Sequence, residues 1–162
     1  MKYVKLTMTA VTLSVAAAGL GTINAAEQQL NPKAIAIKLP DQIPWKRSAA
    51  GTNETAVLYG DPDKPGPYVL MFKWLPGNMS RPHWHPNDRF ITVVKGTWWV
   101  GSGSTYDPNA TVPMPAGTFV NHWAKGVHYD GAKNEPATIL VWGEGPATST
   151  PFVAASDMEK KQ

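Results

Sequence analysis

The spacing of proline and glycine between short runs of strand-forming residues is the feature that most limits the fold of this chain. The chain has 15 Pro and 14 Gly among 162 residues, and they recur between segments rich in β-branched and aromatic residues. One example is "RFITVVKGTWWV", in which Lys95 and Gly96 separate two such segments and indicate a β-hairpin. Strands that recur every ~8–12 residues with turn signals between them are typical of a sandwich or barrel. The sequence therefore predicts an all-β fold.

The first 25 residues have the pattern of a secretory signal peptide. Lys2 and Lys5 precede a run of small and apolar residues, 6–21, and the alanines at 25 and 26 offer a cleavage site. This run is shorter than the roughly 20 residues that a membrane-spanning helix needs. We therefore expect a periplasmic or secreted protein that has no membrane attachment once the signal peptide is removed.

Charge and cysteine content exclude several classes of protein. The chain has no cysteine, which excludes disulfides and thiolate ligands. Removing Lys2 and Lys5 from the 15 basic residues leaves 13 against 12 acidic ones, so the mature chain is nearly neutral. No basic run interleaved with aromatic residues is present, and nucleic acid is therefore not an expected partner. Beyond the signal peptide, we expect an N-terminal extension over 26–55, a barrel over 56–152 and a flexible tail over 153–162.

The four histidines all lie in the central part of the chain, and their spacing predicts a metal site. They are His83, His85, His122 and His128. On a strand, His83 and His85 would share one face, so that both imidazoles could bind one metal ion. His128, in another predicted strand, is the candidate third ligand. Imidazole ligands suit several divalent metals, and the candidates are zinc, iron, nickel, copper and manganese.

The segment "GNMSRPHWHPNDRFITVVKG" resembles the first conserved motif of the cupin superfamily. That motif is a glycine, five residues, H-x-H, three or four residues, a glutamate, six residues and a glycine. Gly77, His83, His85 and Gly96 match it, whereas Arg89 stands at the glutamate position. The resemblance, to small secreted bacterial cupins of the cupin-2 type, implies a double-stranded β-helix, or jelly-roll barrel.

The second cupin motif is matched only in part. "PAGTFV" has the proline and glycine of that motif but Val120 where a histidine is expected. "HYDGAKNEPATILVW" fits the remainder, so the resemblance points to His128 as the second-motif ligand, with His122 as the competing choice. The two motifs cover residues 77–142, close to half of the mature chain.

The missing glutamate leaves three interpretations open, because arginine has no lone pair to offer a metal. The site could be a three-histidine one, in which Arg89 binds a substrate carboxylate beside the metal. Alternatively, His122 or Asp130 supplies an additional ligand. The third interpretation is a pocket without metal. The alternative role for Arg89 is that of a rim residue paired with Asp88 or another carboxylate.

The sequence defines the function of the protein less closely than its fold. The expected function is that of a protein that binds a divalent metal and acts on or binds a small organic molecule, for which an aromatic or carboxylate-bearing compound is the candidate. As an enzyme it would be a metal-dependent oxygenase or lyase; the alternative is a metal-free binding or sensing module or an isomerase.

Seven tryptophans are many for a chain of this length. Trp98 and Trp99 are consecutive, so one should face the inside of the barrel and the other the outside. An outward tryptophan, together with the way cupins often pair, suggests a homodimer.

Overall fold

Antiparallel strands make up most of the regular structure, as the spacing of turn residues predicts. The computed structural model describes residues 30–153, so the predicted signal peptide and most of the predicted tail lie outside the described residues. The chain divides into two units, Met1–Ile37 and Lys38–Gln162. In the described part of the first unit, residues 30–37, the backbone carbonyl of Asn31 accepts hydrogen bonds from the backbone N–H groups of Ala34 and Ile35. These hydrogen bonds close a turn.

The second unit contains all the strands of the described chain. In chain order its elements are η1 (Pro40–Gln42), β1 (Lys46–Arg47), β2 (Asn53–Tyr59), β3 (Gly66–Trp74), β4 (His83–Trp84), β5 (Arg89–Lys95), β6 (Thr97–Ser102), η2 (Pro108–Ala110), β7 (Val112–Pro115), β8 (Phe119–His122), β9 (His128–Gly131), β10 (Ala137–Gly145) and β11 (Thr150–Pro151). Within the described residues, no helix is long and apolar enough to span a membrane.

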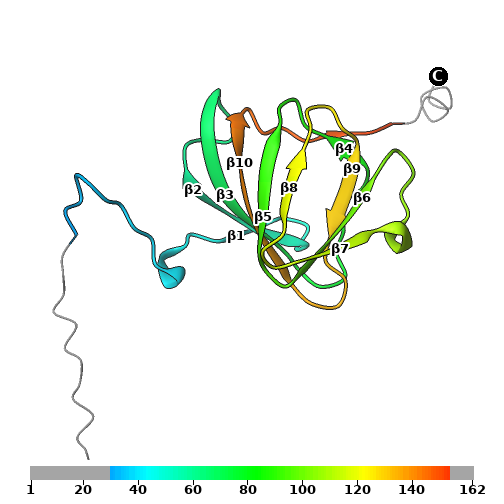
Figure 1. The fold of residues 1–162 in the computed structure, drawn as a ribbon, viewed down its shortest axis with the longest axis horizontal. Coiled ribbons are helices and arrows are strands. Elements are labelled where there is room, and N and C mark those ends of the chain that lie inside the picture. The colour runs from blue at the N-terminus through cyan, green and yellow to red at the C-terminus, as the bar shows by residue number, and fades with distance from the viewer. Residues whose placement is uncertain (1–29, 154–162) are drawn as a thin grey trace, which may run out of the picture. The chain divides into compact units, whose positions relative to one another are not determined.

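The strands form two sheets that face each other (Figure 1). One has six strands in the order β1-β2-β3-β10-β5-β8, and the other has five in the order β11-β4-β9-β6-β7. This is the predicted double-stranded β-helix, or jelly-roll barrel. The six-stranded sheet takes in β1 and the start of β2, which lie in the range 26–55 that the sequence suggested as an extension.

The prediction of a hairpin at Lys95 and Gly96 is wrong. β5 pairs with β10 and β8, whereas β6 pairs with β7 and β9, so the turn carries the chain from one sheet to the other. Gly96 has a φ of 75°, and a Cβ there would collide with the carbonyl oxygen of Pro136. The glycine therefore makes a tight corner of the barrel, a role that its local sequence does not distinguish from a hairpin turn.

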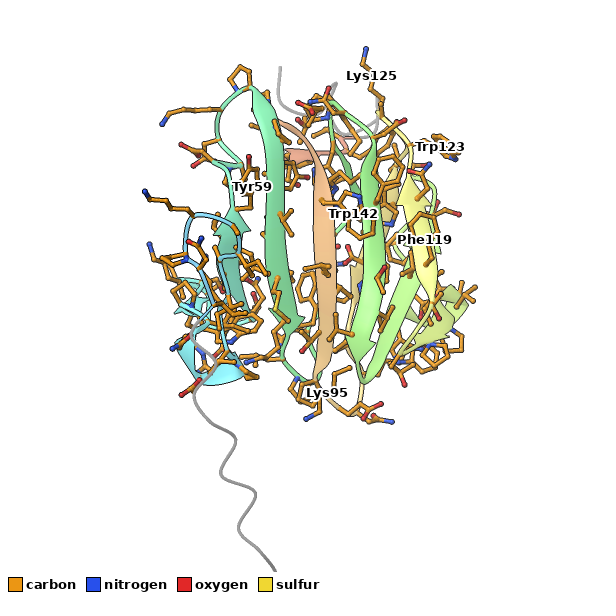
Figure 2. The ribbon with its side chains drawn as sticks, turned by 60° about the vertical axis from the view of Figure 1, so that its left-hand side comes forward. Tyr59, Lys95, Phe119, Trp123, Lys125 and Trp142 are labelled. Atoms are coloured by element: carbon orange, nitrogen blue, oxygen red, sulfur yellow. The ribbon has the colours of Figure 1, made fainter. Side chains whose placement is uncertain are left out.

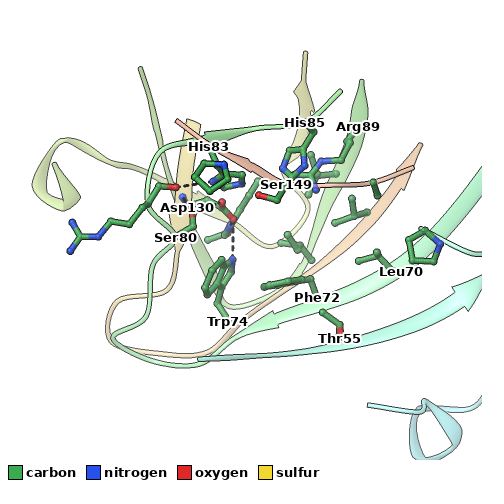
Figure 3. Close-up of a pocket in the computed structure, with 18 of the residues that line it drawn as sticks. Thr55, Leu70, Phe72, Trp74, Ser80, His83, His85, Arg89, Asp130 and Ser149 are labelled. Carbon is green, nitrogen blue, oxygen red and sulfur yellow. Dashed lines mark hydrogen bonds between the residues drawn. The ribbon is translucent and has the colours of Figure 1, made fainter. Parts of the chain in front are cut away.

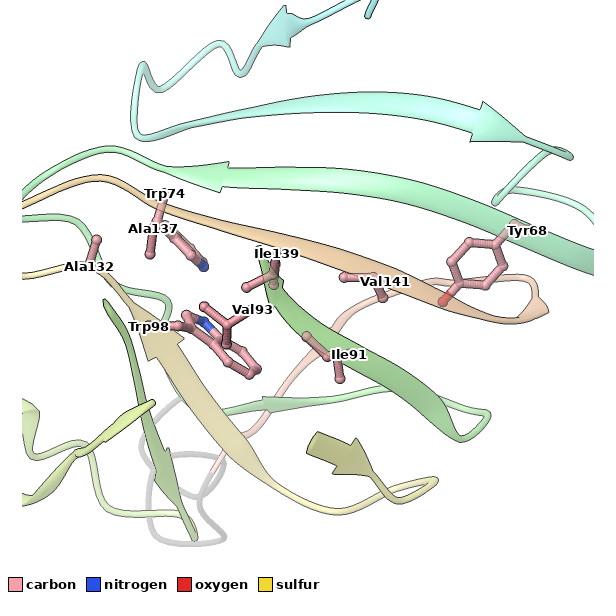
Figure 4. Close-up of a cluster of buried hydrophobic side chains, with 9 residues drawn as sticks. All are labelled: Tyr68, Trp74, Ile91, Val93, Trp98, Ala132, Ala137, Ile139 and Val141. Carbon is pink, nitrogen blue, oxygen red and sulfur yellow. The ribbon is translucent and has the colours of Figure 1, made fainter. Parts of the chain in front are cut away.

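The core lies between the sheets and is built from alternate residues of the strands (Figure 4). Its largest fully buried side chains are Trp98, Tyr68, Ile91 and Val93. Trp98 points inward, whereas the ring of Trp99 lies on the other face of β6, with the Lys133 ammonium 3.9 Å from its centroid. The predicted inward and outward placement of these two tryptophans is confirmed, and the inward one forms a wall of the cavity described next.

Candidate metal centre

Three histidines come together at one end of the cavity between the sheets. His83 on β4 is the direct cross-strand partner of His128 on β9, and their ring centroids are 4.4 Å apart. His85 follows β4, with its ring centroid 4.9 Å from that of His83. One nitrogen from each of the three rings lies within 4.8 Å of the other two. The structure thus brings together the three residues that the sequence nominated as ligands.

Backbone carbonyls fix the orientation of all three rings. The Nδ1 atoms of His83, His85 and His128 lie 2.8, 2.9 and 2.9 Å from the carbonyl oxygens of Arg81, Thr148 and Gly126. Because a carbonyl oxygen only accepts hydrogen bonds, each Nδ1 must carry the proton and donate it. Each Nε2 is then left with a free lone pair, which is the state that a metal ion requires.

The Nε2 atoms of His85 and His128 are buried, and neither has a hydrogen-bond partner within the described part of the chain. Burial lowers the pKa of His85 to about 3 and that of His128 to about 4. These imidazoles are therefore neutral at physiological pH. A divalent metal ion held by the three imidazoles would satisfy these buried lone pairs. The donor set therefore fits a divalent metal.

Arg89 is not a rim residue. It faces the cavity from β5, and its Nε is buried without a partner in the part of the chain that the structure describes. Asp88, its proposed partner, instead accepts a hydrogen bond of 2.6 Å from the backbone N–H of Ala124. Burial lowers the pKa of Arg89 from its ordinary value, but a guanidinium stays protonated in proteins. The pocket wall therefore carries a fixed positive charge beside the histidines.

The register of the six-stranded sheet explains which groups surround Arg89. Tyr68, Gly143, Arg89 and His122 are successive cross-strand partners on β3, β10, β5 and β8. Gly143 has no side chain to separate its neighbours, and a Cβ there would be 3.5 Å from the Tyr68 hydroxyl. Tyr68 therefore reaches across the glycine toward Arg89, and its hydroxyl is buried without a partner among the described residues.

Asp130 shares the inner face of β9 with His128, as regular alternation predicts. It is buried, and its carboxylate accepts hydrogen bonds from the indole N–H groups of Trp74 and Trp98, at 3.0 and 2.9 Å. The Ser80 hydroxyl donates a third, at 3.1 Å. Burial alone would raise the pKa of Asp130, but the nearby histidines and the Trp98 indole hold it below its ordinary value. The cavity wall thus holds a negative charge that its own donors stabilise.

The structure places His122 and Asp130 beside the three histidines but not among them. The His122 ring packs on the His128 ring with centroids 3.8 Å apart, and the group of converging nitrogens includes neither His122 nor Asp130. Both ring nitrogens of His122 are buried without a partner within residues 30–153, and burial lowers its pKa to about 3. His122 and Asp130 therefore stay candidate additional ligands that would need a side-chain movement to join the site.

A cavity of about 530 Å³ opens beside the histidines (Figure 3). His83, His85 and Arg89 lie at one end of it, and Phe72, Leu70 and Thr55 lie farther along the wall. The remaining lining includes apolar side chains from both sheets: Trp74, Ile91, Trp98, Ile139 and Val141. The volume falls within the ~300–1,000 Å³ that is typical of small-molecule sites.

Two features of this site were not predicted from the sequence. Tyr68 was not nominated, because its approach to Arg89 depends on cross-strand register and on Gly143 between them. The contact between Asp130 and the indoles of Trp74 and Trp98 joins residues on three strands from both sheets. The only sequence signal for either was alternation along each strand, which gives the face of a residue but not its neighbour.

Comparison with solved structures finds the same arrangement of strands in proteins of low sequence identity. The polyketide cyclase RemF from Streptomyces resistomycificus has a TM-score of 0.60 at 15% identity, over 78% of this chain and 92% of that one. A cupin 2 conserved barrel domain protein from Rhodopseudomonas palustris has a TM-score of 0.55 at 16% identity, over 77% and 89% of the two chains. KdgF from Halomonas sp. has a TM-score of 0.53 at 16% identity, over 76% and 99%.

No protein-family model and no curated protein sequence matches this chain. At such identities the structural similarity shows the fold, and the chemistry of the site must be argued from its own residues.

Proposed function

Since the chain has the cupin fold, we propose that its three-histidine cluster binds a divalent metal ion and that the adjoining cavity takes a small organic molecule. The observation that carries this proposal is the orientation of His83, His85 and His128. Each Nδ1 donates to a backbone carbonyl, and the free Nε2 lone pairs lie close together. A purely structural histidine cluster would have no need to leave two buried nitrogens without partners.

The chain's own residues give this site its chemical character. The three imidazoles are neutral ligands, and a divalent ion held by them would supply Lewis acidity and lower the pKa of a bound water. Arg89 adds a positive charge to the wall, and Asp130 supplies a negative charge held in place by two indoles. Apolar residues around them exclude water and strengthen these electrostatic interactions.

The proposed activity is a metal-dependent reaction on the bound molecule, either a lyase or an oxygenase reaction. The similarity to a polyketide cyclase supports a small-molecule role, because that protein is named for an organic substrate. A metal-free binding or sensing module, or an isomerase, is the alternative. Removal of metal separates the two, since only the first loses its activity on treatment with a chelator.

The metal content of the protein tests the proposal. We expect about one divalent metal per chain by plasma mass spectrometry, and loss of that metal in a His83→Ala/His85→Ala double variant. Ser149→Ala is the matched control, because it removes a polar group from the same cavity wall without removing an imidazole. Zinc, iron, nickel, copper and manganese are the candidates, and a redox-active metal would favour oxygenase chemistry.

A wild-type protein that holds no stoichiometric metal, even after incubation with each of these ions, would refute the metal proposal. Equal metal content in the wild type and the double variant would refute the ligand assignment instead.

We further propose a periplasmic or secreted location for the mature protein. Support comes from Lys2 and Lys5 before the apolar run at 6–21 and from the alanines at 25 and 26. The mass of the intact protein recovered from the periplasm or the medium tests this location. A mass that retains the first 25 residues would contradict it.

We also propose that the outer face of the six-stranded sheet pairs with a second copy of the chain. The rings of Phe90, Phe119 and Trp142 lie 6.0–6.5 Å apart on this face. Figure 2 shows Tyr59, Phe119 and Trp142 on the same side of the sheet, and Tyr59 and Phe119 are about 60% exposed, at 63% and 60%. Contiguous exposed aromatic side chains are characteristic of protein interfaces.

A further inference from the structure

Arg89 is an unusual cavity residue because it is charged and has no ion-pair partner among the described residues. Among residues 30–153 its guanidinium takes part in no ion pair, and its buried Nε has no hydrogen-bond partner. Burial of an unpaired charge is costly, and such groups normally have a partner in the folded protein or in a ligand. The carboxylate of Asp130 lines the same cavity, but its own donors, Trp74, Trp98 and Ser80, already engage it.

A second unused polar group lies next to the guanidinium. The Tyr68 hydroxyl is buried without a partner in the described chain, and Gly143 between the two strands leaves it room to approach Arg89. A guanidinium and a hydroxyl are both hydrogen-bond donors, and together they match the two oxygens of a carboxylate. The sheet register therefore places these two groups side by side, and among residues 30–153 neither the Arg89 Nε nor the Tyr68 hydroxyl has a hydrogen-bond partner.

The rest of the cavity is suited to the apolar part of such a ligand. Leu70 and Phe72 lie along the wall away from the histidines, and Trp74 lies next to Asp130, to which its indole donates a hydrogen bond (Figure 3). The Phe72 and Trp74 rings are 5.0 Å apart and tilted by 53°, so they form an angled aromatic wall. The Arg89 guanidinium lies at the histidine end of the cavity, so the charged end of such a ligand would bind there. A ligand with one charged and one apolar end would therefore have a single preferred orientation.

We propose that the ligand is a monocarboxylic acid with an apolar body, whose carboxylate binds Arg89 and Tyr68 beside the three histidines while its body lies against Phe72 and Trp74. This inference names the substrate class of the proposed metal site and rests on the proposed function for the role of the metal. The recognition of the acid itself depends on Arg89 and holds with or without the metal.

Paired titrations of acids and their amides test the proposal. Isothermal titration calorimetry would compare phenylacetate with phenylacetamide, and 1-naphthylacetate with 1-naphthylacetamide, on zinc-loaded and on chelator-treated protein. We expect at least one acid to bind about tenfold or more tightly than its amide in both metal states, since a hydrogen bond to a charged group contributes that much. Arg89→Gln should abolish this preference, because it weakens binding of the acid more than binding of the amide.

Two further variants separate recognition from a folding defect. Arg89→Lys keeps the charge but loses the planar guanidinium, and a reduced preference for the acid is expected. Arg81→Gln is the matched control, because Arg81 also lines this cavity but lies over the Tyr106 ring at the surface, with 4.1 Å between the guanidinium carbon and the ring centroid. Arg81→Gln should bind both ligands of each pair as the wild type does.

Wild-type protein that shows no acid binding more tightly than its amide, in either metal state, would overturn the inference. The same conclusion follows if the acid preference disappears on removal of zinc and survives in Arg89→Gln, since the metal would then be the anchor. An acid preference that depends on Arg89 in a protein that binds no metal would support this inference while refuting the proposed function.

Discussion

Burial of His85, His122 and His128 makes the stability of the metal-free protein sensitive to acid. Burial lowers the pKa of His85 and His122 to about 3 and that of His128 to about 4, from an ordinary value of 6.5. Below pH 6.5 the unfolded chain takes up protons at these residues, whereas the folded chain does not until the pH approaches 4. The contribution of these histidines to the free energy of unfolding is therefore complete above pH 6.5 and is lost as the pH falls toward 4.

We predict that the free energy of unfolding falls by about 1.4 kcal/mol per pH unit for each of these histidines in this window. Urea denaturation of chelator-treated protein at several pH values measures the slope. A His122→Asn variant should have a shallower slope by about one proton, since His122 lies outside the proposed ligand set. A free energy that stays constant between pH 6.5 and 4.5 would contradict the prediction.

At the level of single residues, the sequence predicted the groups that strand alternation controls. His83 and His85 share a face, and Asp130 lies on the inner face of β9 with His128. The sequence left the role of Arg89 open between substrate binding and a rim position, because charge alone does not reveal burial. The neighbourhood of Arg89 with Tyr68 could not be predicted, since it is a property of the paired strands.

At the level of elements, the turn between β5 and β6 shows where local sequence is insufficient. A glycine between two strand-forming segments is compatible with a hairpin and with a corner between sheets. The choice is made by long-range pairing, in which β10 and β8 occupy both edges of β5 and leave none for β6. By contrast, β2 and β3 do form a hairpin, because they are consecutive in the chain and antiparallel neighbours in one sheet.

Gly96 should be essential to this corner. We predict that Gly96→Ala destabilises the protein by about 3 kcal/mol, because a left-handed backbone conformation and a collision with the Pro136 carbonyl both oppose the methyl group. Gly51→Ala is the matched control, because Gly51 has a similar φ of 70° but open space around it, and about 1 kcal/mol is expected there. Denaturant unfolding measures both values, and equal losses would show that the corner tolerates a side chain.

At the level of the whole molecule, the outer aromatic face predicts the association state. We expect the protein to sediment as a dimer, and a Phe119→Glu variant to sediment as a monomer, because the charge would be buried in the interface. Val112→Glu is the matched control, since Val112 is 57% exposed but belongs to β7 of the other sheet. A wild-type protein that sediments as a monomer, or two variants with equal behaviour, would contradict the proposal.

The fold as a whole was more predictable than its site. Strand content and turn spacing determine an all-β barrel, since many residues contribute to that pattern and single errors do not change it. The site depends on a few side chains from both sheets, whose proximity follows from the closure of the barrel. His83 and His128 illustrate this difference, because they are 45 positions apart in the chain and direct partners in the structure.

The hydrogen bonds that Trp74 and Trp98 donate to Asp130 give the protein an optical property. Indole emission depends on charge near its N–H group, and these two indoles share a single carboxylate. That carboxylate lies two residues from His128, on the same face of β9. Any ligand that moves or neutralises Asp130 should therefore change the colour and intensity of the protein's own fluorescence, so that occupancy of the cavity could be followed without a label.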